Sequence, residues 1–344
     1  YGLIPRIDPS VPLFIGVAAE AVLKESTFFT GAPSLPDATA YLSDRVPLQL
    51  GPFRITPLLV DHSAFDSYAL MVEAAGRRLL YSGDLRGHGR KPGAFSSLLR
   101  RPPNEVKVLL LEGTTIGRNP GTALATEVDV EEHCAASFAK TDGIALALYS
   151  PQNVDRLVSV FKAARRAGRE LILDLYAASV AAATGRTTIP QPGFEGIRVY
   201  VPQPQRVLVK TAEEFERVNR IRRWRIFEEQ LASNPAGYVM TFRHSMGREL
   251  AGQGLLTGAR ATWMMWPGYL DADGGRALRR WLDEHAIELD VAHASGHATV
   301  DDLKRLAEAV NAERVVPIHT DAPEEFDQHF QRVEVRRDGE WWAV

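Results

Sequence analysis

The fold is decided by a short apolar run that ends in a carboxylate: Val106-Lys107-Val108-Leu109-Leu110-Leu111-Glu112. A run of this length and composition predicts a strand buried on both faces, as in the parallel sheets of α/β proteins. The run Ile144 to Tyr149 repeats the design, and a helix at Val154 to Ala167 and a buried strand at Glu170 to Leu175 follow it. Strand, helix and strand in this order form a β-α-β unit, so we expect a parallel sheet with a right-handed crossover.

The segments on either side of this unit continue the α/β pattern. The prolines between about residues 180 and 210 indicate irregular structure, and the charged stretch Ala212 to Ala232 predicts one long helix. The remaining predicted elements are a helix at Ala18 to Lys24, strands at Phe53 to Val60, Tyr68 to Glu73 and Leu79 to Ser82, short strands at Gly237 to Thr241 and Ala261 to Met265, a helix at Gly274 to His285, a strand at Glu288 to Ala292, a helix at Val300 to Ala309 and a strand at Arg314 to Ile318.

Composition sets limits on compartment and cofactor. With 344 residues, 45% of them hydrophobic and 24% charged, the chain has the make-up of an ordinary globular protein of one large or two interleaved domains. No apolar run of about 18 residues and no basic-then-apolar leader occurs, so we expect a cytoplasmic protein with no membrane partner. The single Cys134 excludes an internal disulfide and an all-cysteine metal site, so a metal would need His and carboxylate ligands.

Global charge does not identify a partner. The net charge of −3 argues against a broadly basic coat for nucleic acid, although a local groove can still be positive. The densest basic cluster is interpreted as a solvated helix face in preference to a phosphate-contacting strip; it comprises Arg217, Arg220, Arg222, Arg223 and Arg225.

Polar side chains follow the ends of several predicted strands. They are His62, Asp84, Glu112, His297 and His319. Because α/β sheets place ligand sites at the carboxyl ends of their strands, we expect these side chains to converge. Imidazole and carboxylate suit zinc, and Asp84 is the natural candidate to bridge two ions held roughly 3.5 to 4 Å apart.

Several ordered motifs carry a family resemblance. Asp61-His62-Ser63 and Tyr81-Ser82-Gly83-Asp84 resemble metal motifs of metallo-β-lactamase-fold hydrolases. Glu112-Gly113-Thr114-Thr115, His293-Ala294-Ser295-Gly296-His297-Ala298 and Pro317-Ile318-His319-Thr320 resemble the three motifs of the β-CASP family. The chain is therefore similar, over nearly its whole length, to RNase J and to the cleavage factor of pre-mRNA 3′ ends.

The resemblance implies an architecture. We expect an α/β fold in which an N-terminally incomplete metallo-β-lactamase αββα sandwich carries an inserted β-CASP α/β domain. The order of the motifs places the metallo-β-lactamase domain in two pieces, residues 1–148 and 284–344, with the β-CASP domain at 149–283.

The resemblance also implies roles for the strand-end residues. His62 and His319 would each bind one zinc ion, and Asp84 would bridge the pair. His297 would be the general acid or would stabilise the leaving group, and Glu112 would orient it and raise its pKa. Glu112 is alternatively a strand-end carboxylate that caps a loop.

Contacts with substrate phosphate are expected from His293, Ser295 and Gly296. Loop residues of the predicted insertion are weaker candidates for phosphate contacts, with a purely structural role equally open: Asn153, Arg156, Arg243, His244 and Ser245. His88 matches no ligand position and is interpreted as a loop residue, and Cys134 as a structural one.

The chain departs from the family at two places. The His-x-His-x-Asp-His loop, which supplies four of the zinc contacts in relatives, does not occur in this sequence. Since Tyr1-Gly2-Leu3-Ile4-Pro5 resembles the segment directly after that loop, we expect upstream residues to carry it. Two zinc ions per site are expected in the family, and this chain would then supply only part of their ligand set. Gly113 stands where relatives often have Ser.

The function favoured by these motifs is zinc-dependent cleavage of RNA phosphodiester bonds, as an endoribonuclease, a 5′-exoribonuclease or both. A non-catalytic RNA-binding or scaffold relative with an incomplete metal site, and a DNA or small-ester hydrolase of the same fold, stay open as alternatives. RNA is the expected partner, and a homo-oligomer is also open.

Overall fold

The computed structural model describes residues 4, 7–8, 10–118 and 123–344, which form two compact units. Residues 12–19, 37–122 and 295–344 make up the mixed-sheet unit, and residues 1–11, 20–36 and 123–294 make up the parallel-sheet unit. Apart from Ile4, the opening segment Tyr1 to Pro5 lies outside the described residues. The assignment of residues 1–148 and 284–344 to one named domain and 149–283 to another stays a prediction.

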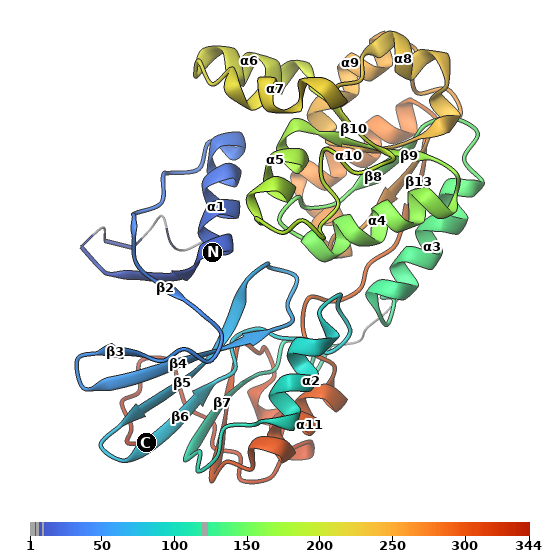
Figure 1. Ribbon diagram of the computed structural model, residues 1–344. Coiled ribbons are helices and arrows are strands. Elements are labelled where there is room, and N and C mark those ends of the chain that lie inside the picture. The colour runs from blue at the N-terminus through green and yellow to red at the C-terminus, as the bar shows by residue number, and fades with distance from the viewer. Residues whose placement is uncertain (1–3, 5–6, 9, 119–122) are drawn as a thin grey trace. The chain divides into compact units, whose positions relative to one another are not determined.

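The mixed-sheet unit is built on a six-stranded sheet in the order β14-β7-β6-β5-β4-β3 (Figure 1). β7 pairs in parallel with both β6 and β14, whereas β3, β4, β5 and β6 pair with one another in antiparallel fashion. The strands are β3 (Leu48–Leu50), β4 (Phe53–Val60), β5 (Ser67–Ala74), β6 (Arg77–Tyr81), β7 (Val108–Glu112) and β14 (Arg314–Ile318).

Helices α2 (Pro92–Arg100) and α11 (Val300–Val310) pack against each other and against this sheet. Their apolar side chains share one core with the strands, in which Leu80 and Leu109 meet Phe95 of α2 and Leu306 of α11. Burial of each of these four side chains stabilises the fold by roughly 1.5–3 kcal/mol. This packing holds the strand ends in place.

The parallel-sheet unit contains a second six-stranded sheet, in the order β10-β9-β11-β8-β12-β13, and every pair in it is parallel. Its strands are β8 (Ala145–Leu148), β9 (Glu170–Asp174), β10 (Ile197–Tyr200), β11 (Tyr238–Thr241), β12 (Arg260–Trp263) and β13 (Glu288–Val291). In the mixed-sheet unit, β1 (Leu13–Gly16) and β2 (Ala38–Leu42) form a separate parallel pair.

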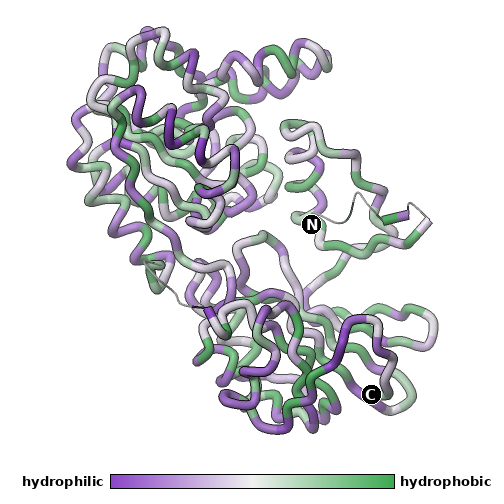
Figure 2. Tube along the Cα trace, turned by 180° about the vertical axis from the view of Figure 1, so that it is seen from behind, coloured by the Kyte–Doolittle hydropathy of each residue, from purple (hydrophilic) through white to green (hydrophobic). Residues whose placement is uncertain are grey.

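Both faces of the parallel sheet are covered, which explains its continuous apolar strands. On β9, Leu171 and Leu173 join one core while Ile172 between them joins another, as the two-residue period of a strand requires. In Figure 2 the helices carry both hydrophilic and hydrophobic residues, as expected where one helix face packs on a sheet and the other faces solvent. The remaining helices are α1 (Val17–Thr30), α3 (Glu127–Ala139), α4 (Val154–Arg166), α5 (Leu175–Ala183), α6 (Gln203–Thr211), α7 (Glu216–Ile221), α8 (Glu228–Ser233), α9 (Gly247–Gly252) and α10 (Asp273–Glu284).

The α/β class expected from the sequence is confirmed, as a mixed α/β molecule with several sheets. Among the residues that the structure describes, no helix is both long and apolar enough to cross a membrane.

The single helix predicted at Ala212 to Ala232 is wrong. The segment holds α7, the short 3-10 helix η2 (Arg222–Trp224) and α8, with an extended break between η2 and α8. Within this break the backbone N–H of Ile226 donates to the carbonyl of Val199 at 3.0 Å, and the Ile226 side chain is buried. The tertiary contact therefore overrides local helix propensity.

The irregular structure predicted for residues 180–210 is also only partly correct. α5 continues to Ala183, β10 spans Ile197–Tyr200 and α6 begins at Gln203. Pro202 precedes α6 and Pro204 lies in its first turn, where a missing N–H costs no helical hydrogen bond. These prolines start a helix instead of excluding one.

Candidate metal centre

The strands of the mixed sheet deliver the candidate residues to one edge. β4, β6, β7 and β14 all run in the same direction, because β4 and β6 are each antiparallel to β5. His62 and Asp84 follow β4 and β6, Glu112 ends β7, and His319 follows β14. In the register of β7 and β14, Ile318 lies opposite Glu112, so His319 emerges next to the carboxylate.

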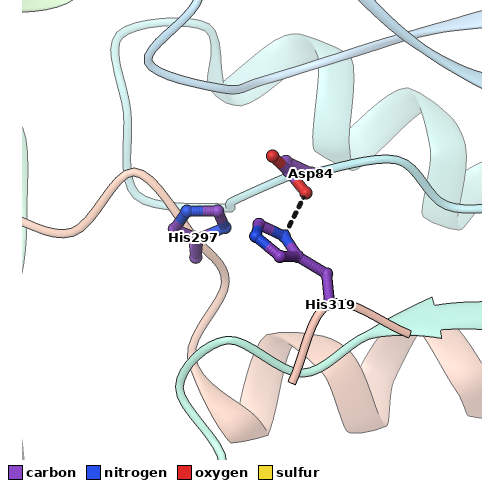
Figure 3. Close-up of side chains that lie close together, drawn as sticks. All are labelled: Asp84, His297 and His319. Atoms are coloured by element: carbon purple, nitrogen blue, oxygen red, sulfur yellow. Dashed lines mark hydrogen bonds and ion pairs between the residues drawn. The ribbon is translucent and has the colours of Figure 1, made fainter. Parts of the chain in front are cut away.

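Asp84, His297 and His319 form a cluster that could hold a metal ion, with one ligand atom of each within 4.8 Å of the others. Figure 3 shows the Asp84 carboxylate and the two imidazoles directed toward one another. His319 Nδ1 lies 2.7 Å from Asp84 Oδ1, and His62 Nε2 lies 4.0 Å from Asp84 Oδ2. The donor set, imidazole nitrogen and carboxylate oxygen, is the one that zinc binds in proteins, so these residues fit that ion.

His319 adopts an uncommon backbone conformation, with φ of 48°. A residue with a β-carbon pays a steric cost in this left-handed region, which persists only where surrounding contacts enforce it. The Thr114 hydroxyl donates to the His319 carbonyl at 3.2 Å and supplies such a contact. The backbone turn immediately after β14 thereby aims the imidazole toward Asp84.

The Glu112 carboxylate is completely buried and accepts from four groups. The backbone N–H groups of Leu85, Thr114 and Ala298 donate to it over 3.1 to 3.4 Å, and His297 Nδ1 lies 3.2 Å from Oε2. Because the carboxylate oxygen accepts from this ring nitrogen, the proton of His297 lies on Nδ1. The Nε2 atom of His297 is then directed away from Glu112.

Burial and neighbouring charge act oppositely on the pKa of His297. Burial is the largest influence and favours the neutral ring, but the hydrogen bond and charge of Glu112, together with the charge of Asp84, outweigh it. The net result is a pKa of His297 raised above its ordinary value. This imidazole therefore keeps its proton more readily near neutrality than a free one does.

His62 has the opposite electrostatic setting. Burial, the largest influence, lowers the pKa of His62 to about 4, with the charge of Asp84 opposing it. His62 Nδ1 donates to the carbonyl of Gly296 at 2.7 Å, which leaves the lone pair of Nε2 on the side of Asp84. A neutral imidazole with one nitrogen hydrogen-bonded to a carbonyl and the other free is the usual form of a zinc ligand.

A buried ion pair holds the loops of the site together, and the sequence reasoning missed it. Arg86 and Asp61 are both fully buried, and Arg86 Nε lies 3.5 Å from Asp61 Oδ1. Arg86 Nη1 also donates to the carbonyl of Ser295 at 2.9 Å, while the Lys91 ammonium donates to the carbonyl of His62. The pair thus joins the loops after β4 and β6 to the loop that carries His297. His88 contacts the same Ser295 carbonyl, in keeping with a loop role.

The predicted phosphate-binding residues fall in two groups. Ser295 and Gly296 belong to the mixed-sheet unit, where the Ser295 hydroxyl accepts from the His297 N–H at 3.0 Å. A β-carbon at Gly296 would approach the Ser63 hydroxyl to 2.7 Å, so only glycine fits without a shift. His293 belongs to the parallel-sheet unit, and its carbonyl accepts from Leu124.

Two of the candidates in the predicted insertion are structural. The Arg156 guanidinium is fully buried, paired with Glu127 at 3.0 Å, and donates to the carbonyl of Met264, so it cannot contact a substrate. The Asn153 side chain caps α4 by accepting from the N–H of Arg156. Arg243 forms a close ion pair with Asp174, whereas His244 and Ser245 are exposed.

Two arginines of the basic cluster and the single thiol have local explanations. Arg217 pairs with Glu25, and its guanidinium lies 4.0 Å from the centre of the Phe28 ring. Arg220 pairs with Glu216. Cys134 is fully buried, and burial raises the pKa of its thiol to about 12, so it is an inert core side chain.

Comparison with known proteins connects this centre to zinc-dependent chemistry. Residues 286–338 match the family model of the Zn-dependent metallo-hydrolase RNA specificity domain. The matched segment includes His293, Ser295, Gly296, His297 and His319. The match supports a zinc metallo-hydrolase of the metallo-β-lactamase superfamily with RNA specificity.

A solved structure shares the fold. The crystal structure of a protein of unknown function from Enterococcus faecalis V583 is similar with a TM-score of 0.73 and 21% sequence identity. The similarity covers 97% of this chain and 76% of that one. At this identity the likeness extends to the fold alone.

Proposed function

We propose that this protein is an RNase J-like nuclease, a zinc-dependent hydrolase that cleaves phosphodiester bonds of RNA. The observation that carries the proposal is the meeting of His62, Asp84, Glu112, His297 and His319 at one edge of the mixed sheet. The zinc-dependent family matched by residues 286–338 supports both the metal and the RNA. In this proposal the fold is a metallo-β-lactamase sandwich that carries a β-CASP insertion.

The proposed zinc ligands are His62, Asp84 and His319. His62 offers a neutral Nε2, and Asp84 offers both carboxylate oxygens, one on the side of each imidazole. Bound zinc would supply an activated water and neutralise charge that develops on the phosphate oxygens. The Arg86–Asp61 pair keeps the loops that bear these ligands in place without taking part itself.

His297 is the proposed general acid. Glu112 holds the Nδ1 proton, and the raised pKa of His297 keeps a second proton on Nε2. That proton moves to the leaving oxygen as the phosphodiester bond breaks, which is worth typically 10²- to 10⁴-fold in rate. Ser295 and Gly296 of the mixed-sheet unit would hold the substrate phosphate, and a phosphate contact by His293 stays a prediction.

His297 also meets the geometric condition for a metal ligand, since it shares a cluster with Asp84 and His319. Substitution distinguishes the two roles. His297→Ala should abolish cleavage of a short RNA while zinc per polypeptide, measured by elemental analysis, stays at the wild-type value. Loss of zinc in the variant would make His297 a ligand instead.

The overall proposal is tested by zinc content and RNA cleavage of the protein made from its full-length gene. Two zinc ions per chain together with cleavage of RNA are the expected result. Zinc near zero and no cleavage would favour an RNA-binding or scaffold relative. Cleavage of DNA or of a small ester in place of RNA would retain the metal site and change the substrate class.

A further inference from the structure

The parallel-sheet unit contains a cavity that the proposed metal centre does not use. Its volume is about 570 Å³, within the usual range for small-ligand sites. All of its lining residues belong to the parallel-sheet unit, and they come from the start of α6, the segment from η4 (His244–Met246) into α9, and the end of α10. The residues that the argument uses are Gln203, His244, Ser245, Arg248, Trp281 and His285.

One wall of the cavity is aromatic. The indole ring of Trp281 lies 5.5 Å from the ring of Phe242 in stacked geometry, 4.4 Å from His285 and 5.9 Å from His244. A β-carbon at Gly247 would approach the indole to 2.6 Å, so the glycine lets the ring lie directly against the backbone. A planar ligand ring would continue this wall by stacking.

The lining of the cavity also offers hydrogen-bond donors. In the described part of the chain, the side chains of Gln203, Ser245 and Arg248 have no hydrogen-bond or ion-pair partner. His285 Nδ1 donates to the Trp281 carbonyl at 2.8 Å, which leaves Nε2 available to a ligand.

The one acidic residue in the lining, Glu249, has a partner for each of its carboxylate oxygens. The carboxylate of Glu249 is buried; one oxygen accepts from the Arg206 guanidinium, and the other accepts from the N–H of Gln203 at 2.7 Å. Both oxygens of Glu249 thus have partners, although Arg206 also pairs with Glu228 at 3.1 Å. Within the described residues, Arg248 is the guanidinium of the lining without an ion-pair partner. An unpaired guanidinium with neighbouring hydroxyl and imidazole groups is suited to a phosphate.

We propose that this cavity binds a nucleotide, with the base against the Trp281 wall and the phosphate on Arg248 and Ser245. The same chemistry is presented by a free nucleoside monophosphate and by one nucleotide of a single-stranded RNA. The site is separate from the proposed hydrolysis and does not depend on it.

The test is calorimetric titration of the wild-type protein with adenosine and uridine 5′-monophosphates. We expect one nucleotide per chain, and binding that Arg248→Gln weakens by roughly tenfold to a hundredfold, as loss of a charge-assisted hydrogen bond implies. Gly247→Ala, which drives a methyl group into the indole, should weaken binding as well. Arg222→Ala removes another exposed arginine of the same unit and should leave binding unchanged.

Titration of His297→Ala protein with a short single-stranded RNA separates the two sources. If monophosphates bind, a free nucleotide occupies the site; if only the RNA binds, and Arg248→Gln weakens it, the occupant is a nucleotide within a chain. Absence of binding by both probes overturns the proposal. Inorganic phosphate bound as tightly as a monophosphate, or binding indifferent to both Arg248→Gln and Gly247→Ala, overturns it too. None of these readouts depends on zinc or on RNA cleavage.

Discussion

Two buried carboxylates end strands in the two sheets, yet their surroundings give them different chemistry. Glu112 is the last residue of β7, and Asp174 is the last residue of β9. Both side chains are fully buried and both accept backbone N–H groups. They differ in the basic side chain that each one meets.

Asp174 meets a guanidinium. Arg243 Nε and Nη2 lie 2.6 and 3.2 Å from the two carboxylate oxygens, and Gln205 donates to the same group. Glu112 meets the imidazole of His297 instead, and no arginine or lysine contacts it among the residues that the structure describes. Since a guanidinium does not release its proton and an imidazole does, the first pair only holds structure, whereas the second can move a proton. A strand-end carboxylate is thus insufficient to mark a reactive site; the partner decides.

The largest effect should be on zinc content, which should fall in a variant at the edge of the mixed sheet but not in a variant at the edge of the parallel sheet. Asp84→Asn removes a charged ligand and should lower zinc per polypeptide and reduce RNA cleavage by roughly 10³-fold or more, given the several kcal/mol that metal contacts supply. Asp174→Asn, at the edge of the other sheet, should retain both zinc and cleavage in its folded fraction. Elemental analysis and a cleavage assay on the two variants make the comparison, and equal zinc in both would contradict the role of Asp84.

The second effect concerns stability, and it is expected at the edge of the parallel sheet, where Asp174 lies. Asp174→Ala leaves the guanidinium of Arg243 without its partner, and breaking a buried pair in this way should cost about 3 kcal/mol of unfolding free energy. The matched control is Asp271→Ala, because its pair with Arg279 is largely exposed and should contribute less than about 1 kcal/mol. Urea denaturation measures both variants; similar losses would show that burial of the pair does not matter.

A third effect follows from the pKa of His62, about 4 in the folded chain against an ordinary value of 6.5. The folded state disfavours the charged ring, so the unfolded chain binds more protons between these pH values. The contribution of His62 to stability is therefore complete above pH 6.5 and is lost as the pH falls toward 4, by up to about 3 kcal/mol.

His62→Gln tests this pH dependence in zinc-free protein. The variant cannot take up that proton, so the difference in unfolding free energy between wild type and variant should change with pH only inside this window. Denaturation at several pH values between 4 and 7 measures it. A difference that stays constant across the window would mean that the imidazole is solvated or charged in the folded protein.

Patterns that depend on neighbouring residues could be read from the sequence with good accuracy. The strands predicted at Phe53 to Val60 and Arg314 to Ile318 are confirmed to the residue as β4 and β14. The gathering of His62, Asp84, Glu112 and His319 also follows from strand order, because side chains that follow co-directional strands emerge at one edge. Their chemical roles, together with the expected phosphate contacts, stay predictions.

Features that depend on distant contacts could not be read. The break in the expected helix at Ala212 to Ala232 is caused by a hydrogen bond from Ile226 to Val199, which no local pattern signals. Arg156 is a candidate for a phosphate contact because of its place in the predicted insertion, yet its guanidinium pairs with Glu127 inside the core. The Arg86–Asp61 brace was missed for the same reason. An arginine two residues after a metal motif gives a weak signal, since its partner is recognised only once the loops are folded.

The smallest effect, and the most specific one for the comparison, is a shift of the pH profile in Glu112→Gln. The amide can still accept from the Nδ1 proton of His297, but it removes the charge that raises the pKa of this imidazole. Burial then acts with less opposition, so the ring loses its proton at lower pH. The alkaline limb of kcat/KM for RNA cleavage should therefore move to lower pH, while zinc content is unchanged. Asp174 contacts a guanidinium and not an imidazole, so Asp174→Asn should leave that limb in place. If both variants kept the wild-type profile, proton donation would have to come from a group other than His297, and the difference between an imidazole partner and a guanidinium partner would carry no catalytic meaning.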